Sequence, residues 1–227
     1  MRKFLSILFS VYVFFALAQK TTTIKFKDKA KYTGETKGKN PHGKGTYYYS
    51  NGDVYEGNFK HGKMHGEGVY FYKTGKVFTG KFILGEINGI GECKYENGDY
   101  YFGNWKNGVK SGYGNYKYAN GSEYSGIWEN DLKNGKGELK FPNWDKYEGD
   151  FKYNHRTGEG IFYFSNGDKY EGSFLNGEMH GKGVYYFKNG AYLTCNWISN
   201  KRNGNCQQTN KDGSEKELNY FNDKIRK

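Results

Sequence analysis

The chain has 227 residues, with 34 Gly, 23 Tyr, 17 Phe and 4 Trp but only 2 Pro. Aliphatic residues are scarce, so burial must come from aromatic rings that lie over glycine backbone, and the aromatic content excludes a disordered chain. The formal net charge is +11, carried by Lys residues interleaved with Asp and Glu. This pattern is typical of a solvated surface, and we expect no nucleic-acid partner because the chain has no Arg-rich arm or nucleic-acid fingerprint.

The first eighteen residues are typical of a secretory signal peptide. Arg2 and Lys3 precede an apolar run over residues 4–18, which ends in the small-x-small pattern Ala16-Leu17-Ala18. The run has about 15 residues, whereas a membrane span needs ~20. We therefore predict a cleaved signal peptide at 1–18 and a secreted or periplasmic protein, with a net charge of +9 once the two basic residues are removed. An uncleaved N-terminal membrane anchor is the alternative.

After a lead-in at 19–31, a unit of 23 residues recurs without insertion. We number the positions of this unit from zero. Position 0 is aromatic in seven of eight copies: Tyr32, Tyr55, Phe78, Tyr101, Tyr124, Tyr147, Tyr170 and Leu193. Position 11 is always glycine: Gly43, Gly66, Gly89, Gly112, Gly135, Gly158, Gly181 and Gly204. A fixed period of this length predicts a repeat protein.

The consensus Tyr-x-Gly-x-(Phe/Trp)-x-x-Gly-x-x-x-Gly-x-Gly-x-x-x-(Tyr/Phe)-x-x-Gly resembles the MORN repeat (membrane occupation and recognition nexus). The run Tyr55-Glu56-Gly57-Asn58-Phe59-Lys60-His61-Gly62, followed by Gly66-Glu67-Gly68, matches it closely. The resemblance covers residues 32–213. It implies protein binding or assembly, sometimes by self-association, and the family name adds binding to a membrane surface.

The spacing also predicts the shape of each repeat. Because side chains alternate across a strand, positions 0, 2 and 4 share one face, and so do positions 11, 13, 15 and 17. That face is aromatic with glycine gaps into which rings can fold. Pairs such as Asn97-Gly98 are strong hairpin signals. We predict an all-β fold, an elongated single-sheet antiparallel meander of about eight hairpins, on the order of 70–80 Å long.

The repeat pattern ends at Gly213, and residues 214–227 form a capping tail. Ser214-Glu215-Lys216-Glu217 reads as a helix capping box, and Leu218, Phe221 and Ile225 follow at helical spacing. We predict a short C-terminal helix over the last hairpin. A frayed strand is the alternative.

Two cysteines occupy glycine positions of the last repeat. Cys195 stands at position 2 and Cys206 at position 13, and a turn centred between positions 7 and 8 places them opposite each other at a Cα separation of ~4.5–5.5 Å. In an oxidising compartment we predict a disulfide worth up to ~3 kcal/mol. Cys93 falls on the aromatic face, where a buried free thiol is expected. Three reduced packing cysteines are the alternative.

No motif for catalysis or for a cofactor is evident. His42, His65 and His180 recur at position 10, but equivalent positions lie ~10 Å apart, too far to share one metal ion. Gly-x-Gly occurs in every hairpin without a following helix, unlike a phosphate loop. We expect no enzyme, no metal site, no cofactor and no small-molecule substrate.

The opposite face carries the candidate binding residues. Position 16 places three Lys in consecutive repeats, a stripe suited to anionic lipid head groups or acidic polymers: Lys94, Lys117 and Lys140. Glu92 and Glu138 partly neutralise it, so cross-strand pairing is the alternative. Candidate partner-binding aromatics are those at position 16 in other repeats and the one that replaces a turn glycine: Tyr48, Phe71, Tyr163, Tyr186 and Trp144.

These features lead to two main functional hypotheses, and carbohydrate binding through exposed Tyr and Trp is a third, weaker one. The first is an exported repeat scaffold for protein–protein interaction or assembly, because long repeat surfaces suit extended partners. The second is binding to an anionic membrane surface through the Lys stripe. Export weakens the second, since the anionic lipids usually involved lie on cytoplasmic leaflets.

Overall fold

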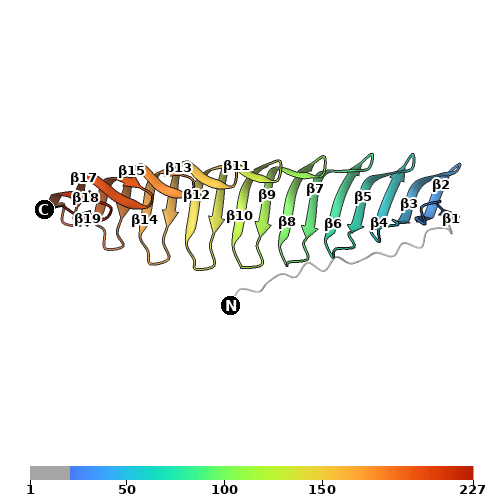
Figure 1. Cartoon of the computed structure of the whole chain (residues 1–227), viewed down its shortest axis with the longest axis horizontal. Helices are drawn as coiled ribbons and strands as arrows, with labels where there is room; N and C mark the ends of the chain where they lie inside the picture. The colour runs from blue at the N-terminus through green and yellow to red at the C-terminus, as the bar shows by residue number, and fades with distance from the viewer. Residues whose placement is uncertain (1–20, 227) are drawn as a thin grey trace.

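The computed structural model describes residues 21–226, which form one open antiparallel sheet of 19 strands. Each strand pairs with the next strand along the chain, from β1 (Thr22–Lys25) to β19 (Lys224–Ile225). Figure 1 shows the strands side by side along a rod, with β1 and β19 at opposite ends. The predicted all-β meander of about eight hairpin repeats is confirmed. The predicted signal peptide lies outside the described residues.

Each repeat supplies a strand of seven residues and a strand of nine. The first strands are β2 (Lys31–Lys37), β4 (Val54–Lys60), β6 (Val77–Ile83), β8 (Tyr100–Lys106), β10 (Glu123–Glu129), β12 (Lys146–Lys152), β14 (Lys169–Leu175) and β16 (Tyr192–Ile198). The second strands are β3 (Asn40–Tyr48), β5 (Lys63–Phe71), β7 (Glu86–Lys94), β9 (Val109–Lys117), β11 (Leu132–Lys140), β13 (His155–Tyr163), β15 (Glu178–Tyr186) and β17 (Lys201–Thr209). Within residues 21–226 there is no helix, and so none that is long and apolar enough to cross a membrane.

Two kinds of turn alternate along the rod. Within a repeat, a two-residue turn joins the strands, and in the second to eighth repeats both of its residues have positive φ, as at Asn130 (50°) and Asp131 (67°). This is the type I′ turn that suits the twist of a hairpin. Between repeats, Tyr95 and Asp99 close a longer loop in which the Gly98 N–H donates to the Tyr95 carbonyl. Asn-Gly pairs such as Asn97-Gly98 therefore lie in the inter-repeat loops, whereas Asn107-Gly108 and Asn176-Gly177 form turns within repeats.

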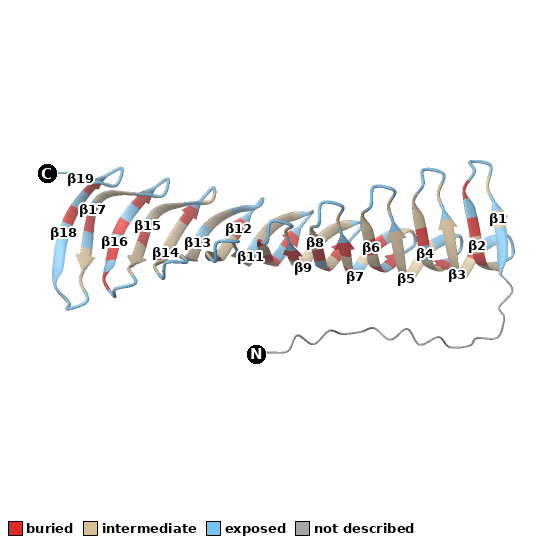
Figure 2. Cartoon of the chain, turned by 90° about the horizontal axis from the view of Figure 1, so that it is seen from below, coloured by how far each residue is buried: buried red, intermediate tan, exposed pale blue. Residues whose placement is uncertain are grey.

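The core is a row of tyrosine rings that lie on glycine backbone. Tyr55 is fully buried, and its hydroxyl donates to the Asn58 carbonyl at 3.0 Å. The ring covers Gly57 and Gly68, which face each other on β4 and β5. A Cβ on Gly57 would lie 2.5 Å from the Tyr55 hydroxyl oxygen. Figure 2 shows the buried residues in the middle of the strands and the exposed residues at the turns.

A second set of aromatic rings, at position 4, joins neighbouring repeats. Phe59 of the same strand packs edge-on against Tyr55 at 5.1 Å between ring centroids, and Phe82 of the next repeat does so at 4.9 Å. Edge-to-face contacts of this kind stabilise by roughly 0.5–1.5 kcal/mol each beyond their area. The same three-ring contact recurs along the sheet, so each repeat buries its rings only against its neighbours.

The two strands of a repeat change register near position 11. Gly57 pairs with Gly68, but Phe59 pairs with Met64, so the second strand contains two extra residues. Gly66 lies in this bulge with a φ of 71°, a conformation that favours glycine. Because the shift is an even number of residues, the alternation of faces is preserved and Met64 lies on the aromatic face.

The C-terminal tail does not form the predicted helix. Residues Glu215–Phe221 form β18, which pairs with β17 and continues the register of the repeats. Leu218 and Tyr220 are buried at alternating positions, whereas Phe221 and Ile225 are exposed. The predicted capping box is instead a turn in which the Ser214 N–H and hydroxyl both donate to Asp212. The helix prediction was wrong because the free edge of β17 offers backbone hydrogen bonds that helical spacing alone does not reveal.

The ring-on-glycine contact can be tested by a double-mutant cycle. Gly68→Ala is expected to destabilise the protein by about 1–3 kcal/mol, because the new Cβ would lie 2.5 Å from Cε2 of Tyr55. The loss in free energy of unfolding in the double variant Gly68→Ala/Tyr55→Leu should be at least ~1 kcal/mol smaller than the summed losses of the two single variants. Urea unfolding followed by circular dichroism measures all three. Additive losses would show that the ring does not impose glycine at this position.

Candidate functional site

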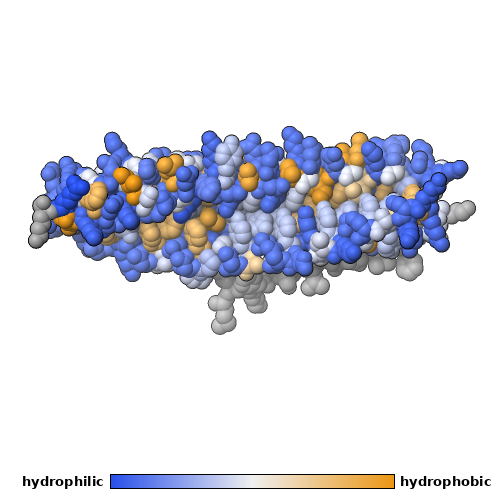
Figure 3. Space-filling view, viewed as in Figure 1, coloured by the Kyte–Doolittle hydropathy of each residue, from blue (hydrophilic) through white to orange (hydrophobic). Residues whose placement is uncertain are grey.

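Half-buried aromatic side chains form a continuous band along one face of the rod. They come from positions 15 and 17 of successive repeats and pack on the buried rings below: Tyr47, Tyr49, Tyr70, Tyr72, Tyr95, Tyr118, Phe141, Phe162, Phe164, Tyr185 and Phe187. Together with the position 9 side chains beside it, we call this band the aromatic groove. Figure 3 shows pale and orange residues along the length of the rod between blue margins.

Position 9 sets the depth of the groove. Its side chains are Pro41, Met64, Ile87, Lys110, Lys133, Arg156, Met179 and Arg202. Near Met64 and Ile87 a hollow of about 330 Å³ opens beside Tyr70 and Tyr72. A second hollow, of about 320 Å³, lies beside Met179 and is lined by Phe164, Phe187 and Trp197. The first hollow also has Glu86 and Asn107 in its lining, and the second has Asn200, Arg202 and Asp223. The groove therefore has a hollow of mixed aromatic and polar lining toward each end, with three cationic side chains between them.

The three central cations lie over aromatic rings. The Lys110 Nζ is 4.4 Å from the Trp128 ring centroid, and the Lys133 Nζ is 5.4 Å from that of Tyr124. The Arg156 guanidinium lies 5.2 Å from the Phe162 ring centroid. Burial lowers the pKa of all three side chains, and the Lys110 side chain is only 12% exposed. Cation–π attraction offsets part of the cost of removing these charges from water.

These groove residues were missed by the sequence analysis, although the signal was present. Position 9 has the same parity as positions 11, 13, 15 and 17, which were assigned to the aromatic face. The same alternation of side chains places Lys110, Lys133 and Arg156 on the aromatic face, so this column of cations can be predicted from the sequence. Their burial cannot, because it depends on the bulge that brings the start of the second strand against the rings.

The predicted Lys stripe lies on the opposite face, where its residues are exposed. Two of its members are paired: the Lys117 Nζ lies 3.1 Å from Glu123, and the Lys140 Nζ lies 2.9 Å from Glu138. Lys94 has no ion pair within 4 Å among the described residues. Exposed pairs of this kind contribute little to stability, but they neutralise the charge of the stripe.

Four of the predicted partner-binding aromatics lie on this same face, and Trp144 lies in the loop between β11 and β12. Tyr48 and Tyr186 each lie beneath a neighbouring ammonium group, at 4.3 Å from Lys31 and 4.2 Å from Lys169. Phe71 is 38% exposed and Trp144 is 89% exposed. The structure brings three candidates together around an open depression of about 720 Å³: Lys140, Trp144 and Tyr163.

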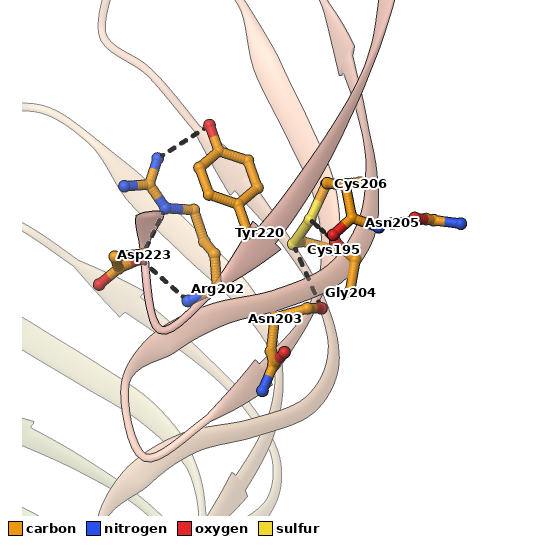
Figure 4. Close-up of a disulfide and its surroundings, with 9 residues drawn as sticks. Cys195, Arg202, Asn203, Gly204, Asn205, Cys206, Tyr220 and Asp223 are labelled. Carbon is orange, nitrogen blue, oxygen red and sulfur yellow. Dashed lines mark hydrogen bonds and ion pairs between the residues drawn. A yellow bond between two sulfur atoms is a disulfide. The ribbon is translucent and has the colours of Figure 1, made fainter. Parts of the chain in front are cut away.

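The structure joins Cys195 and Cys206, with Cα atoms 4.5 Å apart (Figure 4). They occupy the facing positions that are glycine in the other repeats. Leu193 stands at position 0 of this repeat, so no tyrosine ring covers the pair and the space admits two side chains. Cys93 is a buried free cysteine at position 15, and burial raises the pKa of its thiol.

Aspartates link successive inter-repeat loops. Asp53 accepts hydrogen bonds from the Tyr70 hydroxyl at 2.9 Å and from the Lys73 N–H at 2.8 Å, both in the next repeat. Burial alone would raise the pKa of Asp53, but these hydrogen bonds and one from Asn51 outweigh it and lower the pKa. Asp99 and Asp168 make the same contacts, and their pKa values are lowered for the same reasons. These carboxylates are therefore structural.

Within residues 21–226, no group of three or more His, Cys, Asp or Glu side chains is placed to hold a metal ion. The hairpins and the single open sheet define an elongated all-β repeat protein. The MORN repeat family model matches residues 32–54, 55–77, 78–100, 101–123, 124–146, 147–169, 170–192 and 196–215. The chain belongs to the MORN repeat family.

Comparison with other known proteins adds only weak similarities. No curated protein matches the sequence. The chain is similar to the TCP domain of SAS-4 (dCPAP) from Drosophila melanogaster, solved with a proline-rich motif of Ana2 (dSTIL), at 14% identity over 90% of this chain and 93% of that one, with a TM-score of 0.42. It is similar to the TCP10 domain of Danio rerio CPAP, solved with a STIL peptide, at 10% identity over 90% and 97%, with a TM-score of 0.48. Similarity at this level carries no functional argument.

The cysteine assignments can be tested on protein that has not been reduced. A proteolytic digest should contain the Cys195 and Cys206 peptides linked to each other. Cys93 should react with iodoacetamide only after denaturation, because its side chain is fully buried and its thiol is held protonated. Mass spectrometry measures both results. Alkylation of all three cysteines in the native protein would contradict the assignment.

The aspartate links predict a specific acid sensitivity. Folding lowers the pKa of Asp53, Asp99 and Asp168, so their contribution is complete above the unfolded pKa of about 3.9 and is lost as the pH falls through the folded values. Ser122 occupies the same repeat position as these aspartates, so Ser is a natural replacement. With all three replaced by Ser, the urea concentration at the unfolding midpoint should fall less between pH 6 and pH 2.5 than it does in the wild type. An unchanged pH profile would show that other carboxylates dominate.

Proposed function

We propose that this MORN repeat protein is a non-catalytic scaffold that binds an extended protein partner in its aromatic groove. The observation that carries the proposal is the pair of hollows, of about 330 and 320 Å³, whose aromatic and aliphatic walls lie beside Ile87 and Met179. Half-buried aromatic and Met side chains around a hollow are suited to receive apolar anchors of a partner. The regular backbone between them suits a partner that lies along the rod.

The dimensions support a partner that spans several repeats. Ile87 and Met179 stand four repeats apart, and each repeat contributes two strands spaced ~4.8 Å, so the hollows are separated by about 40 Å. An extended chain of about 12 residues covers that distance. A globular partner that touches one repeat does not need both hollows, so binding that depends on both is the signature of the proposed mode.

Binding to the anionic membrane surface is the alternative proposal, and the ion pairs weigh against it. Two of the three Lys in the predicted stripe already have carboxylate partners, which leaves Lys94 to supply free charge. Sedimentation with vesicles containing phosphatidylserine tests it directly. Sedimentation of the wild type but not of a Lys94→Gln/Lys117→Gln/Lys140→Gln variant would support the lipid alternative over the groove.

We further propose that the protein is exported and works in an oxidising compartment. The signal-peptide pattern at residues 1–18 and the Cys195–Cys206 bond agree with each other, because disulfides persist mainly outside the cytosol. The mature protein isolated from its producer should begin at Gln19. Recovery of the intact N-terminus from a membrane fraction would instead support the anchor.

Filling the hollows tests the proposed binding mode. Met64→Lys/Met179→Lys introduces the residue that position 9 already has at Lys110 and Lys133, so the fold should be kept. Partner capture from the producer's extracellular or envelope fraction should fall at least tenfold, because each long charged side chain would occupy a hollow and place a charge beside its aromatic walls. Quantitative mass spectrometry of captured proteins measures the change.

The matched control places Lys on the opposite face. Val54→Lys/Val77→Lys adds the same charge at a position that is already Lys at Lys146 and Lys169. This control should capture partners as well as the wild type does. If the control and the groove variant lose the same partners equally, the groove is not the binding surface.

A further inference from the structure

Two of the four cations at position 9 are paired with an aspartate of the chain. The partner position is the second residue of the two-residue turn in the next repeat. Lys110 faces Asp131, with 4.0 Å between Nζ and Oδ1, and Arg202 faces Asp223, with 2.7 Å between Nε and Oδ1. Where position 9 is apolar, as in Met64, the partner is uncharged, here Gly85.

The other two cations, Lys133 and Arg156, lack this aspartate. The residue opposite Lys133 is Asn154, and the residue opposite Arg156 is Gly177. The Lys133 Nζ meets only the Tyr118 hydroxyl at 3.2 Å, and an Arg156 guanidinium nitrogen donates to the Gly177 carbonyl. Among the described residues, neither cation has a carboxylate within 4 Å. These are two neighbouring positive charges without a matching negative charge.

Their surroundings make a carboxylate ligand favourable. Both side chains are partly withdrawn from water and lie over aromatic rings, in a part of the groove with reduced solvent screening. Burial lowers the pKa of each, and the repulsion between them adds to this for Lys133. An anion placed beside them would relieve that repulsion and replace lost hydration. Arg156 also lines a hollow of about 110 Å³ next to Phe162 and Met179, which leaves room for a ligand atom.

We propose that the aromatic groove binds an acidic protein segment in the polyproline II conformation, with two carboxylates three residues apart that pair with Lys133 and Arg156. This inference rests on the proposed function and names the chemistry of the partner. The ligand would supply the carboxylates that Asn154 and Gly177 do not.

The spacing of the cations selects the conformation of the ligand. Lys133 and Arg156 are one repeat apart, or about 9.6 Å for two strands. In polyproline II, residues i and i+3 lie on the same side and about 9.3 Å apart. In a β-strand, residues on one side are about 6.7 Å or about 13.4 Å apart, and neither spacing matches. Aromatic-lined grooves are also the surfaces on which polyproline II segments dock.

Synthetic peptides of equal composition test the spacing. Pro-Glu-Pro-Pro-Glu-Pro places its carboxylates at i and i+3, and Pro-Glu-Pro-Glu-Pro-Pro places them at i and i+2. Titration into ¹⁵N-labelled mature protein, followed by NMR chemical shifts, gives the Kd and the location of binding. The first peptide should bind at least fivefold more tightly than the second, with shifts in β11 and β13. Equal affinities, or no binding of either peptide, would overturn the proposal.

Matched variants test the two cations. Lys133→Met/Arg156→Met introduces the residue that position 9 has at Met64 and Met179, and it should weaken binding of the first peptide at least tenfold. Lys94→Met/Lys140→Met removes the same charge from the opposite face and should change the Kd less than twofold. A similar loss of affinity in both variants would show that only the net charge matters. If heparin or single-stranded DNA binds more tightly than the peptide, and Lys133→Met/Arg156→Met weakens that binding whereas Lys94→Met/Lys140→Met does not, the two cations bind another kind of polyanion.

The two proposals can fail separately. Partner capture that is lost in Met64→Lys/Met179→Lys but kept in Lys133→Met/Arg156→Met would leave the groove as the binding surface and overturn the acidic ligand. Peptide binding that follows the predicted spacing, without capture of any protein partner, would instead count against the scaffold function.

Discussion

The tyrosine ring at position 0 can lie flat on the sheet only because two facing residues have no side chain. Tyr55 covers Gly57 and Gly68, and its hydroxyl reaches the carbonyl of Asn58 three residues on. A single sheet has no second layer to bury its rings, so the rings must be buried in the sheet itself. The glycines at positions 2 and 13 are therefore a packing requirement. Where the ring is absent, at Leu193, the requirement ends and a disulfide occupies the space.

This local solution makes the rod modular. Each ring contacts its own repeat and the next one, and the aspartate links such as Asp53 to Tyr70 also join only neighbours. Stability in such a protein is approximately a sum over repeats and their interfaces, and the end repeats are the weakest. β1 and β18 cover the first and last repeats with an additional strand, and the disulfide lies in the last full repeat. The reinforcement is thus placed where neighbours are missing.

The 23-residue period was sufficient to predict the strands, their faces and the buried rings, because each of these depends on local spacing alone. The C-terminal tail was not predictable in the same way: Leu218, Phe221 and Ile225 fit a helix, and only the free edge of β17 decides for a strand. The candidate residues at position 16 were placed on a shared face, but sequence spacing does not show that Lys117 and Lys140 have carboxylate partners. The hollows beside Ile87 and Met179 depend on how side chains of neighbouring repeats pack against one another, which no pattern of residue types shows.

The same residue type therefore has a different meaning on the two faces of this sheet. Lys140 is more than half exposed and lies beside Glu138, so its charge is screened by water and by its partner. Lys133 has similar chemistry but lies over aromatic rings with no carboxylate among the described residues within 4 Å, where screening is weaker and an added anion gains more. Counting basic residues along the chain favours the exposed face. When burial and the presence of a carboxylate partner are taken into account, the aromatic groove becomes the expected binding surface.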